Sequence, residues 1–410
     1  MIPAILSLAV VSFVIAWVGT LLMKRVAPRI GFVDKPGHRK IHRKPIPLGG
    51  GVAIFWAYVL PMLAAVVAAR VLDPASPPAG IGVLRQNWAA YLGGARQQTP
   101  IALALVGAMA VMHVMGLLDD RRAIGPYIKL FVQLGVTVAL VVPFKSLWPL
   151  TAWDDRLHLH GVLSVGISVL WITAITNAFN FLDNMDGLSA GVAAVCTAAF
   201  LVAALSIGQW FVAAALAMLL GAVLGFFCFN CPPASIFMGD SGSLLLGLVL
   251  GVLTIRTTYL PAGADFGAGW YAVFAPVIVL AVPLYDLVVV SAIRLSRGKS
   301  PFVGDTNHFS HRLVARGMSK RTAVLCIYLI TAATAVAAIV LPHVRSAFTA
   351  MLIFLQTILI LCVVMLLEQH PLPPAKMEAE LAGAGENSVP EPAVRQARMP
   401  FPPQAGMPDR

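Results

Sequence analysis

The sequence predicts an all-α, polytopic membrane protein with about eleven transmembrane helices and its N-terminus outside. Of its 410 residues, 59% are hydrophobic and only 11% are charged, whereas soluble domains are about 45–50% apolar and about 25% charged. The apolar residues come in runs of about 20, the length that a helix needs to cross a bilayer. The sequence lacks the alternating pattern of a membrane barrel, so each span should be a helix.

Eleven apolar runs account for the predicted spans, and the chain between and after them is polar. The first run is too long for the core of a cleaved signal peptide and is followed by Lys24 and Arg25, so we expect it to remain as a helix. We predict a transmembrane domain over 1–369 and a disordered cytoplasmic tail over 370–410, which is rich in Pro, Ala, Gly and Glu. The predicted spans are residues 2–23, 48–69, 100–118, 127–144, 162–182, 187–206, 210–229, 243–260, 270–293, 322–341 and 347–367.

The net charge of +11 is explained by membrane topology. Of the 29 Lys and Arg residues, 18 lie in 24–47, 119–129 and 294–321. Alternation of eleven spans places these three segments on one side of the membrane, and the positive-inside rule makes that side cytoplasmic. We therefore expect the bilayer, and no nucleic acid, as a partner.

The acidic residues of the membrane body are all aspartates, because every glutamate lies at residue 368 or beyond. Twelve aspartates precede that point. Seven of them fall at predicted cytoplasmic helix ends and loops, and an eighth, Asp286, falls inside the ninth span. Acids at membrane depth are costly and usually functional. Carboxylates that converge on one face suit Mg²⁺ and a phosphate substrate.

Two motifs place acids at the ends of apolar helices. In residues 116–129, GLLDDRRAIGPYIK, Asp119 and Asp120 end the third span and point about 100° apart, so they should have different tasks. A solvated helix end is the alternative.

In residues 177–188, NAFNFLDNMDGL, polar groups recur every three residues and form a slowly winding stripe that needs partners or a ligand. Its alternative is a structural network between helices. The stripe consists of Asn177, Asn180, Asp183 and Asp186.

A third motif, FMGDSGSLLLG at 237–247, sets Asp240 between two glycines just before the eighth span. Asp240, Ser241 or Ser243 could cap this helix. Alternatively, the glycine-flanked helix start admits a phosphate, and Asp240 holds a metal ion beside it.

The remaining motifs are basic. Residues 305–313, DTNHFSHRL, contain His308, His311 and Arg312, which suit phosphate and sugar hydroxyl groups; a plain polar loop is the alternative. The first loop, 34–51, is rich in Lys and Arg, including Lys44, for which topology or attraction to anionic lipid is the alternative.

Together these segments resemble the bacterial polyprenyl-phosphate N-acetylhexosamine-1-phosphate transferase family, of the undecaprenyl-phosphate GlcNAc-1-phosphate transferase type (glycosyltransferase family 4), over about residues 30–320. The resemblance implies an enzyme of the bacterial cytoplasmic membrane whose active site faces the cytoplasm. It would transfer a sugar 1-phosphate from a UDP-N-acetylhexosamine to undecaprenyl phosphate and release UMP, the first step of cell-surface polysaccharide synthesis such as that of O-antigen. Mg²⁺ would be required, with Mn²⁺ as a substitute, and a homodimer is left open.

The resemblance also implies residue roles. Asp119 and Asp120 look catalytic, and Asp240 and Asp183 look like metal ligands. The other implied residues bind substrate: Asn177, Asn180, Asp186, Lys129, Lys44, Asp305, His308, His311 and Arg312. Ser310 stands where the family has a further histidine. Two alternatives remain. One is a peptidoglycan-type phospho-MurNAc-pentapeptide translocase. The other, from a different class, is a secondary transporter, whose site would lie near the bilayer midplane.

Overall fold

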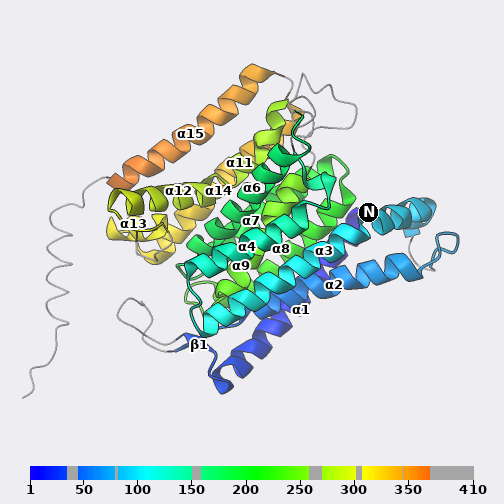
Figure 1. Ribbon diagram of the computed structural model, residues 1–410, viewed down its shortest axis with the longest axis horizontal. Helices are drawn as coiled ribbons and strands as arrows, with labels where there is room; N and C mark the ends of the chain where they lie inside the picture. The colour runs from blue at the N-terminus through cyan, green and yellow to red at the C-terminus, as the bar shows by residue number, and fades with distance from the viewer. Residues whose placement is uncertain are drawn as a thin grey trace, which may run out of the picture. The chain divides into compact units, whose positions relative to one another are not determined.

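Helices form over all the predicted apolar runs in the computed structural model (Figure 1). The structure describes residues 1–34, 45–78, 82–149, 158–257, 270–301, 307–344 and 346–369. The predicted disordered tail, 370–410, lies outside the described residues and stays a prediction. Met1–Gln369 form one compact unit.

Most of the described residues are helical. The α-helices are α1 (Ile2–Arg29), α2 (Gly50–Val71), α3 (Trp88–Arg121), α4 (Pro126–Val141), α6 (Val162–Leu182), α7 (Leu188–Ser206), α8 (Trp210–Asn230), α9 (Asp240–Arg256), α11 (Ala275–Val279), α12 (Ala281–Ser296), α13 (Phe309–Ala315), α14 (Lys320–Val340) and α15 (Ala347–Gln369). Short 3₁₀ helices are η1 (Gly82–Asn87), η2 (Lys145–Leu147), η3 (Trp270–Phe274) and η4 (Leu341–His343), and two strands are β1 (Val33–Asp34) and β2 (Ile46–Pro47).

The predicted class, an all-α polytopic membrane protein, is confirmed. Within the described ranges, eight helices are long and apolar enough to cross a membrane: α1, α2, α3, α6, α7, α8, α14 and α15. The other three predicted spans are shorter or broken, because α4 has 16 residues, α9 has 17, and the ninth span is divided into α11 and α12 at Leu280. The count of eleven and the outer N-terminus stay predictions.

A small antiparallel ladder, which the sequence pattern did not predict, joins the two ends of the first loop. Val33 pairs with Pro47 and Asp34 with Ile46, and Leu48 N–H donates to the Phe32 carbonyl at 3.0 Å. This ladder fixes the start of α2 beside the end of α1.

Helix α9 lies in the interior of the bundle, packed mainly against α3, α6 and α2. All residues from Ser241 to Thr254 are buried, as expected for a helix that is apolar on every side. Its neighbours approach it at glycines. A Cβ on Gly116 of α3 would lie 2.4 Å from Ser241 Cα, and one on Gly247 would lie 2.4 Å from Thr176 Cα of α6. Small residues of this kind let membrane helices pack backbone against backbone.

The chain enters α9 through backbone pairing with the start of α2. The amides of Gly50 and Gly51 donate to the carbonyls of Phe237 and Met238, each at 3.0 Å. Gly239 then turns into the helix with φ of +72°, a conformation that glycine adopts without steric cost. The N-terminus of α9 is therefore held at one end of the bundle, next to the start of α2.

The C-terminal helix α15 lies at the margin of the bundle, with its far end beside α13 (Figure 1). Only 17% of its most apolar stretch is buried within the protein. Its exposed leucines and isoleucines suit contact with lipid.

We predict that Gly116→Ala destabilises the protein. The added methyl group would overlap the backbone of Ser241, and overpacking of this kind costs about 1–3 kcal/mol. The measurement is the midpoint of thermal unfolding in detergent. Gly107→Ala is the matched control on the same helix, because nothing lies within 4 Å of its Cβ position, and its midpoint should stay equal or rise. Equal midpoints for the two variants would contradict the close approach.

Candidate active site

Four carboxylates and one ammonium group gather around the N-terminus of α9. Asp119 and Asp120 come from the end of α3, Asp183 from the residue after α6, and Asp240 from the first residue of α9. Lys129 comes from the first turn of α4. Three of the motifs singled out in the sequence therefore converge, as alternation of the spans predicts.

Lys129 lies between two of the carboxylates. Its Nζ is 2.7 Å from Asp240 Oδ2 and 3.0 Å from Asp119 Oδ2. The other oxygen of Asp119 accepts a hydrogen bond from the Ile124 amide at 2.9 Å. These side chains are only 14–24% exposed, so the pairs are less screened than surface ion pairs. Lys129, predicted to hold phosphate, here neutralises two acids and ties α3 and α4 to α9.

Asp120 faces the other way and caps α9 from a different helix. Its Oδ1 accepts from the Asp240 amide at 2.7 Å and its Oδ2 from the Ser241 amide at 3.1 Å. The first amides of a helix have no partner within it, and the N-cap residue Gly239 has no side chain to offer. The alternative in which α9 is capped by one of its own side chains is therefore wrong. The different orientations expected for Asp119 and Asp120 are confirmed.

The asparagine stripe divides between the two interpretations. Asn180 Nδ2 donates to Asp240 Oδ1 at 2.9 Å and to Ser243 Oγ at 3.0 Å, so Asn180 belongs to the acid cluster. Asn177 Nδ2 instead donates to Gln133 Oε1 at 2.7 Å and to the Thr173 carbonyl at 2.8 Å. The Asn177 amide therefore links α6 to α4, as in the alternative interpretation of the stripe as a structural network between helices.

The turn after α6 carries the last two acids of the stripe. Asp183 is the C-cap of α6 and lies beside the Gly239 backbone. Burial, followed by the negative charges of Asp240 and Asp120, raises the pKa of Asp183 to about 8. Asp186 Oδ2 accepts from the Ala234 amide at 2.9 Å and so holds the segment that leads into α9. The cluster thus carries more negative charge than Lys129 balances, and Asp183 keeps a proton at neutral pH.

This chemistry fits a hard divalent cation. In the described part of the chain, no group of three or more His, Cys, Asp or Glu side chains is arranged to hold a metal ion by itself. Mg²⁺, however, usually takes one or two carboxylates and completes its shell with water and substrate phosphates. Asp240 and Asp183 are two such carboxylates, close enough for the charge of one to raise the pKa of the other.

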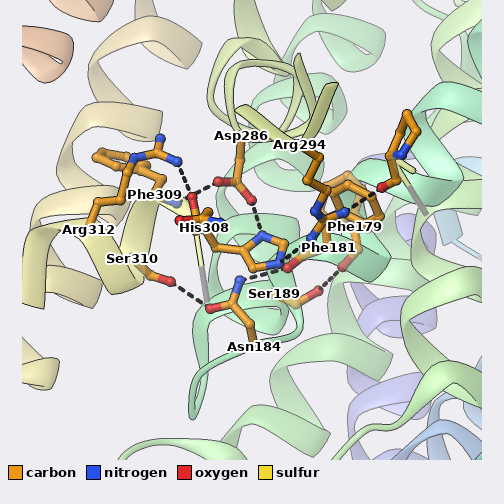
Figure 2. Close-up of polar contacts among 12 residues, drawn as sticks. Phe179, Phe181, Asn184, Ser189, Asp286, Arg294, His308, Phe309, Ser310 and Arg312 are labelled. Atoms are coloured by element: carbon orange, nitrogen blue, oxygen red, sulfur yellow. Dashed lines mark hydrogen bonds and ion pairs between the residues drawn. The ribbon is translucent and has the colours of Figure 1, made fainter. Parts of the chain in front are cut away.

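The histidine motif lies on α13 and contacts α12 (Figure 2). His308 is buried, and its Nδ1 is 2.9 Å from Asp286 Oδ2. His311 is half-buried, with its ring centroid 6.3 Å from that of His308. Lys44 and Asp305, predicted to bind substrate, lie outside the described residues.

Arg312 pairs with an acid that the sequence analysis assigned no role. Its Nη2 is 3.0 Å from Glu368 Oε1, and Tyr285 Oη donates to Glu368 Oε2 at 3.0 Å. Arg316 Nε donates to the Glu368 carbonyl at 2.8 Å. The end of α15 is thereby fixed to α13. The signal that could have found Glu368 was its position, since it is the first glutamate of the chain and ends an apolar run.

A separate cavity of about 410 Å³ lies at the other end of the bundle, where its lining includes Met62, Trp210 and Arg256. Arg256 ends α9 and Asp240 begins it, so at 1.5 Å per residue the two are about 24 Å apart. This cavity is therefore not part of the acid cluster.

The fold and the cluster define a polytopic membrane protein whose acids gather at one end of the bundle, as expected of a membrane phosphotransferase. The chain belongs to glycosyl transferase family 4. The sequence model of that family matches residues 102–258, which contain Asp119, Lys129, Asn180, Asp183 and Asp240.

Curated relatives cover most of the chain. A probable undecaprenyl-phosphate N-acetylglucosaminyl 1-phosphate transferase of Bacillus subtilis is 33% identical over 352 residues, which are 84% of this chain and 87% of the relative. A decaprenyl-phosphate N-acetylglucosaminephosphotransferase of Mycobacterium tuberculosis is 29% identical over 77% of each chain. The undecaprenyl-phosphate alpha-N-acetylglucosaminyl 1-phosphate transferase of Escherichia coli K12 is 28% identical over 75% of this chain and 76% of the relative.

We predict that Asp120→Asn loosens the start of α9. The amide group would turn a donor toward a backbone N–H, and loss of a charged hydrogen bond of this kind costs about 1.5–3 kcal/mol. Hydrogen–deuterium exchange of peptides that cover 238–244 should become faster. Asp119→Asn is the control, since Asp119 contacts Lys129 and Ile124 instead. If both variants speed exchange equally, Asp120 is not the cap.

Proposed function

We propose that this protein transfers N-acetylglucosamine 1-phosphate from UDP-N-acetylglucosamine to undecaprenyl phosphate, releasing UMP, at the cytoplasmic face of the bacterial inner membrane. The observation that carries the proposal is the cluster of Asp119, Asp120, Asp183, Asp240 and Lys129 in a chain whose curated relatives are named for this transfer. The relatives favour N-acetylglucosamine over the phospho-MurNAc-pentapeptide alternative. The segments richest in Lys and Arg support the cytoplasmic face.

The reaction exchanges one phosphoanhydride bond for another. An oxygen of the lipid phosphate attacks the β-phosphorus of the UDP-sugar, the bond from that phosphorus to the bridging oxygen breaks, and UMP leaves with that oxygen. The nucleophile is already an anion, so the site must mainly align two phosphates and offset their charge. The same need explains why acids and a lysine meet in one place.

Each residue of the cluster has a part in this proposal. Mg²⁺, held by Asp240 and Asp183, would supply charge neutralisation at the donor phosphates. Asn180 orients the Asp240 carboxylate through its 2.9 Å hydrogen bond. Lys129 is the cation that can turn from the carboxylates to a phosphate oxygen, and Asp119 holds it near the site. Asp120 keeps the first turn of α9 in place beneath the site.

We predict that Asp240→Asn lowers turnover by at least about a hundredfold, because a carboxylate that would hold Mg²⁺ is removed, and with it the positive charge that stabilises the transition state. The measurement is UMP release by purified protein in detergent with undecaprenyl phosphate, Mg²⁺ and UDP-N-acetylglucosamine, and EDTA should abolish it in the native protein. UDP-N-acetylgalactosamine and UDP-MurNAc-pentapeptide serve as competing donors. Asp73→Asn is the matched control, since Asp73 follows α2 at the end remote from Asp240. Near-normal turnover of Asp240→Asn would refute the metal role, and faster turnover of another donor would refute the sugar.

We further predict that Mg²⁺ binding releases a proton near neutral pH. The raised pKa of Asp183, about 8, means that the carboxyl is protonated at pH 7, and a bound cation displaces that proton. Proton release should approach one per Mg²⁺ at pH 7 and decline toward zero well above pH 8, so Mg²⁺ affinity should rise over this range. Calorimetry in buffers of different ionisation enthalpy measures the release, and Asp183→Asn should lack it. Unchanged release in Asp183→Asn would place the proton elsewhere.

A further inference from the structure

The buried carboxylate of Asp286 makes hydrogen bonds to two residues of the histidine motif, His308 and Phe309. Asp286 lies in α12 and is 0% exposed. Its Oδ1 accepts from the Phe309 amide at 2.6 Å, and its Oδ2 is 2.9 Å from His308 Nδ1 (Figure 2). A buried carboxylate without partners is costly, so these contacts satisfy Asp286 and at the same time fix the N-terminus of α13.

The neighbours of His308 determine which ring nitrogen carries the proton. Nε2 lies 3.4 Å from Arg294 Nη2, and a guanidinium group has only donors. Nε2 must therefore accept, and Nδ1 must carry the hydrogen that Asp286 accepts. The ring is also covered by the edge contact with Phe181, at a centroid distance of 5.5 Å, and His308 is only 6% exposed. Both nitrogens thus have partners within the protein.

Ser310 joins the same segment to the acid-bearing turn. Its hydroxyl donates to Asn184 Oδ1 at 2.6 Å, and Asn184 Nδ2 donates to the Phe181 carbonyl at 2.6 Å (Figure 2). Asn184 directly follows Asp183. The start of α13 is therefore held by α12 on one side and by the turn after α6 on the other.

We propose that Asp286 and His308 are positioning residues, which hold the start of α13 beside the Asp183 turn, and that His308 does not contact the substrate. His311, half-buried on the next turn of α13, is then the histidine of the motif that serves the donor. The proposal rests on the proposed function for the meaning of the motif, but its geometry can be tested without substrate.

Two substitutions at position 308 separate positioning from substrate contact. An asparagine side chain can place its amide near the position of Nδ1 and keep the donation to Asp286, whereas a glutamine places its amide near Nε2. We expect His308→Asn to retain most of the kcat/KM for the UDP-sugar and His308→Gln to lose at least about tenfold, since small displacements of a positioned group have large effects. The loss should appear mainly in the KM for the donor, and the KM for undecaprenyl phosphate should change little. His311→Asn should raise the donor KM but leave the unfolding temperature unchanged, whereas His308→Gln should lower that temperature.

Two measurements on protein without substrate complete the test. Thermal unfolding should occur at a lower temperature in His308→Gln and in Asp286→Asn than in His308→Asn. In the native protein labelled with ¹⁵N-histidine, the signal that disappears in His308→Asn should be that of a neutral ring protonated at Nδ1. A ring protonated at Nε2, or greater activity and stability in His308→Gln than in His308→Asn, would overturn the proposal. If native protein transfers no sugar phosphate while the tautomer and the order of stabilities agree, the proposed function fails and the positioning pair stands.

Discussion

Two backbone amides at the start of α9 have no partner within the helix, and the carboxylate of Asp120, on α3, accepts hydrogen bonds from both. The helix cannot supply this carboxylate itself, because glycine occupies its N-cap and a Cβ there would lie 2.5 Å from Asp120 Oδ2. At Gly51 and Gly116 the neighbouring helices also approach the backbone of α9 too closely to admit a Cβ. The position of α9 relative to α3 is therefore fixed by hydrogen bonding and by backbone contact together. Asp240 is the first residue of α9, so its backbone position is fixed as well.

Charge balance is the second constraint on the cluster. Acids placed this close raise the free energy of the folded state unless cations, protons or hydrogen-bond donors offset them. The cluster uses all three: Lys129 bridges Asp119 and Asp240, Asp183 keeps a proton, and Asn180 donates to Asp240. A site that is incompletely neutralised in this way suits a divalent cation, because the cation supplies the missing positive charge when it binds and can then bridge to substrate phosphates.

The segment that carries the histidines is attached to this core by a different set of interactions. Asp286 and Asn184 hold its first residues, and Glu368 holds Arg312 one turn later. Glu368 belongs to α15, which is otherwise exposed at the margin of the bundle. The last helix therefore contributes to the site indirectly, by stabilising the position of α13, although it lies far along the chain from the acids.

The sequence by itself determined the helical membrane class, most helix positions and the set of acids at one end of the bundle, because hydropathy runs and their alternation are local properties that the bilayer thickness constrains. Tertiary structure decided the partner of each side chain. It assigned Asp120 to an amide 120 residues away, directed Asn177 into a helix-to-helix network, and enclosed His308 between Asp286 and Arg294. Such pairings depend on which helices pack together and at which rotation, and neither follows from spacing along one helix, since each contact joins residues that are distant in the chain.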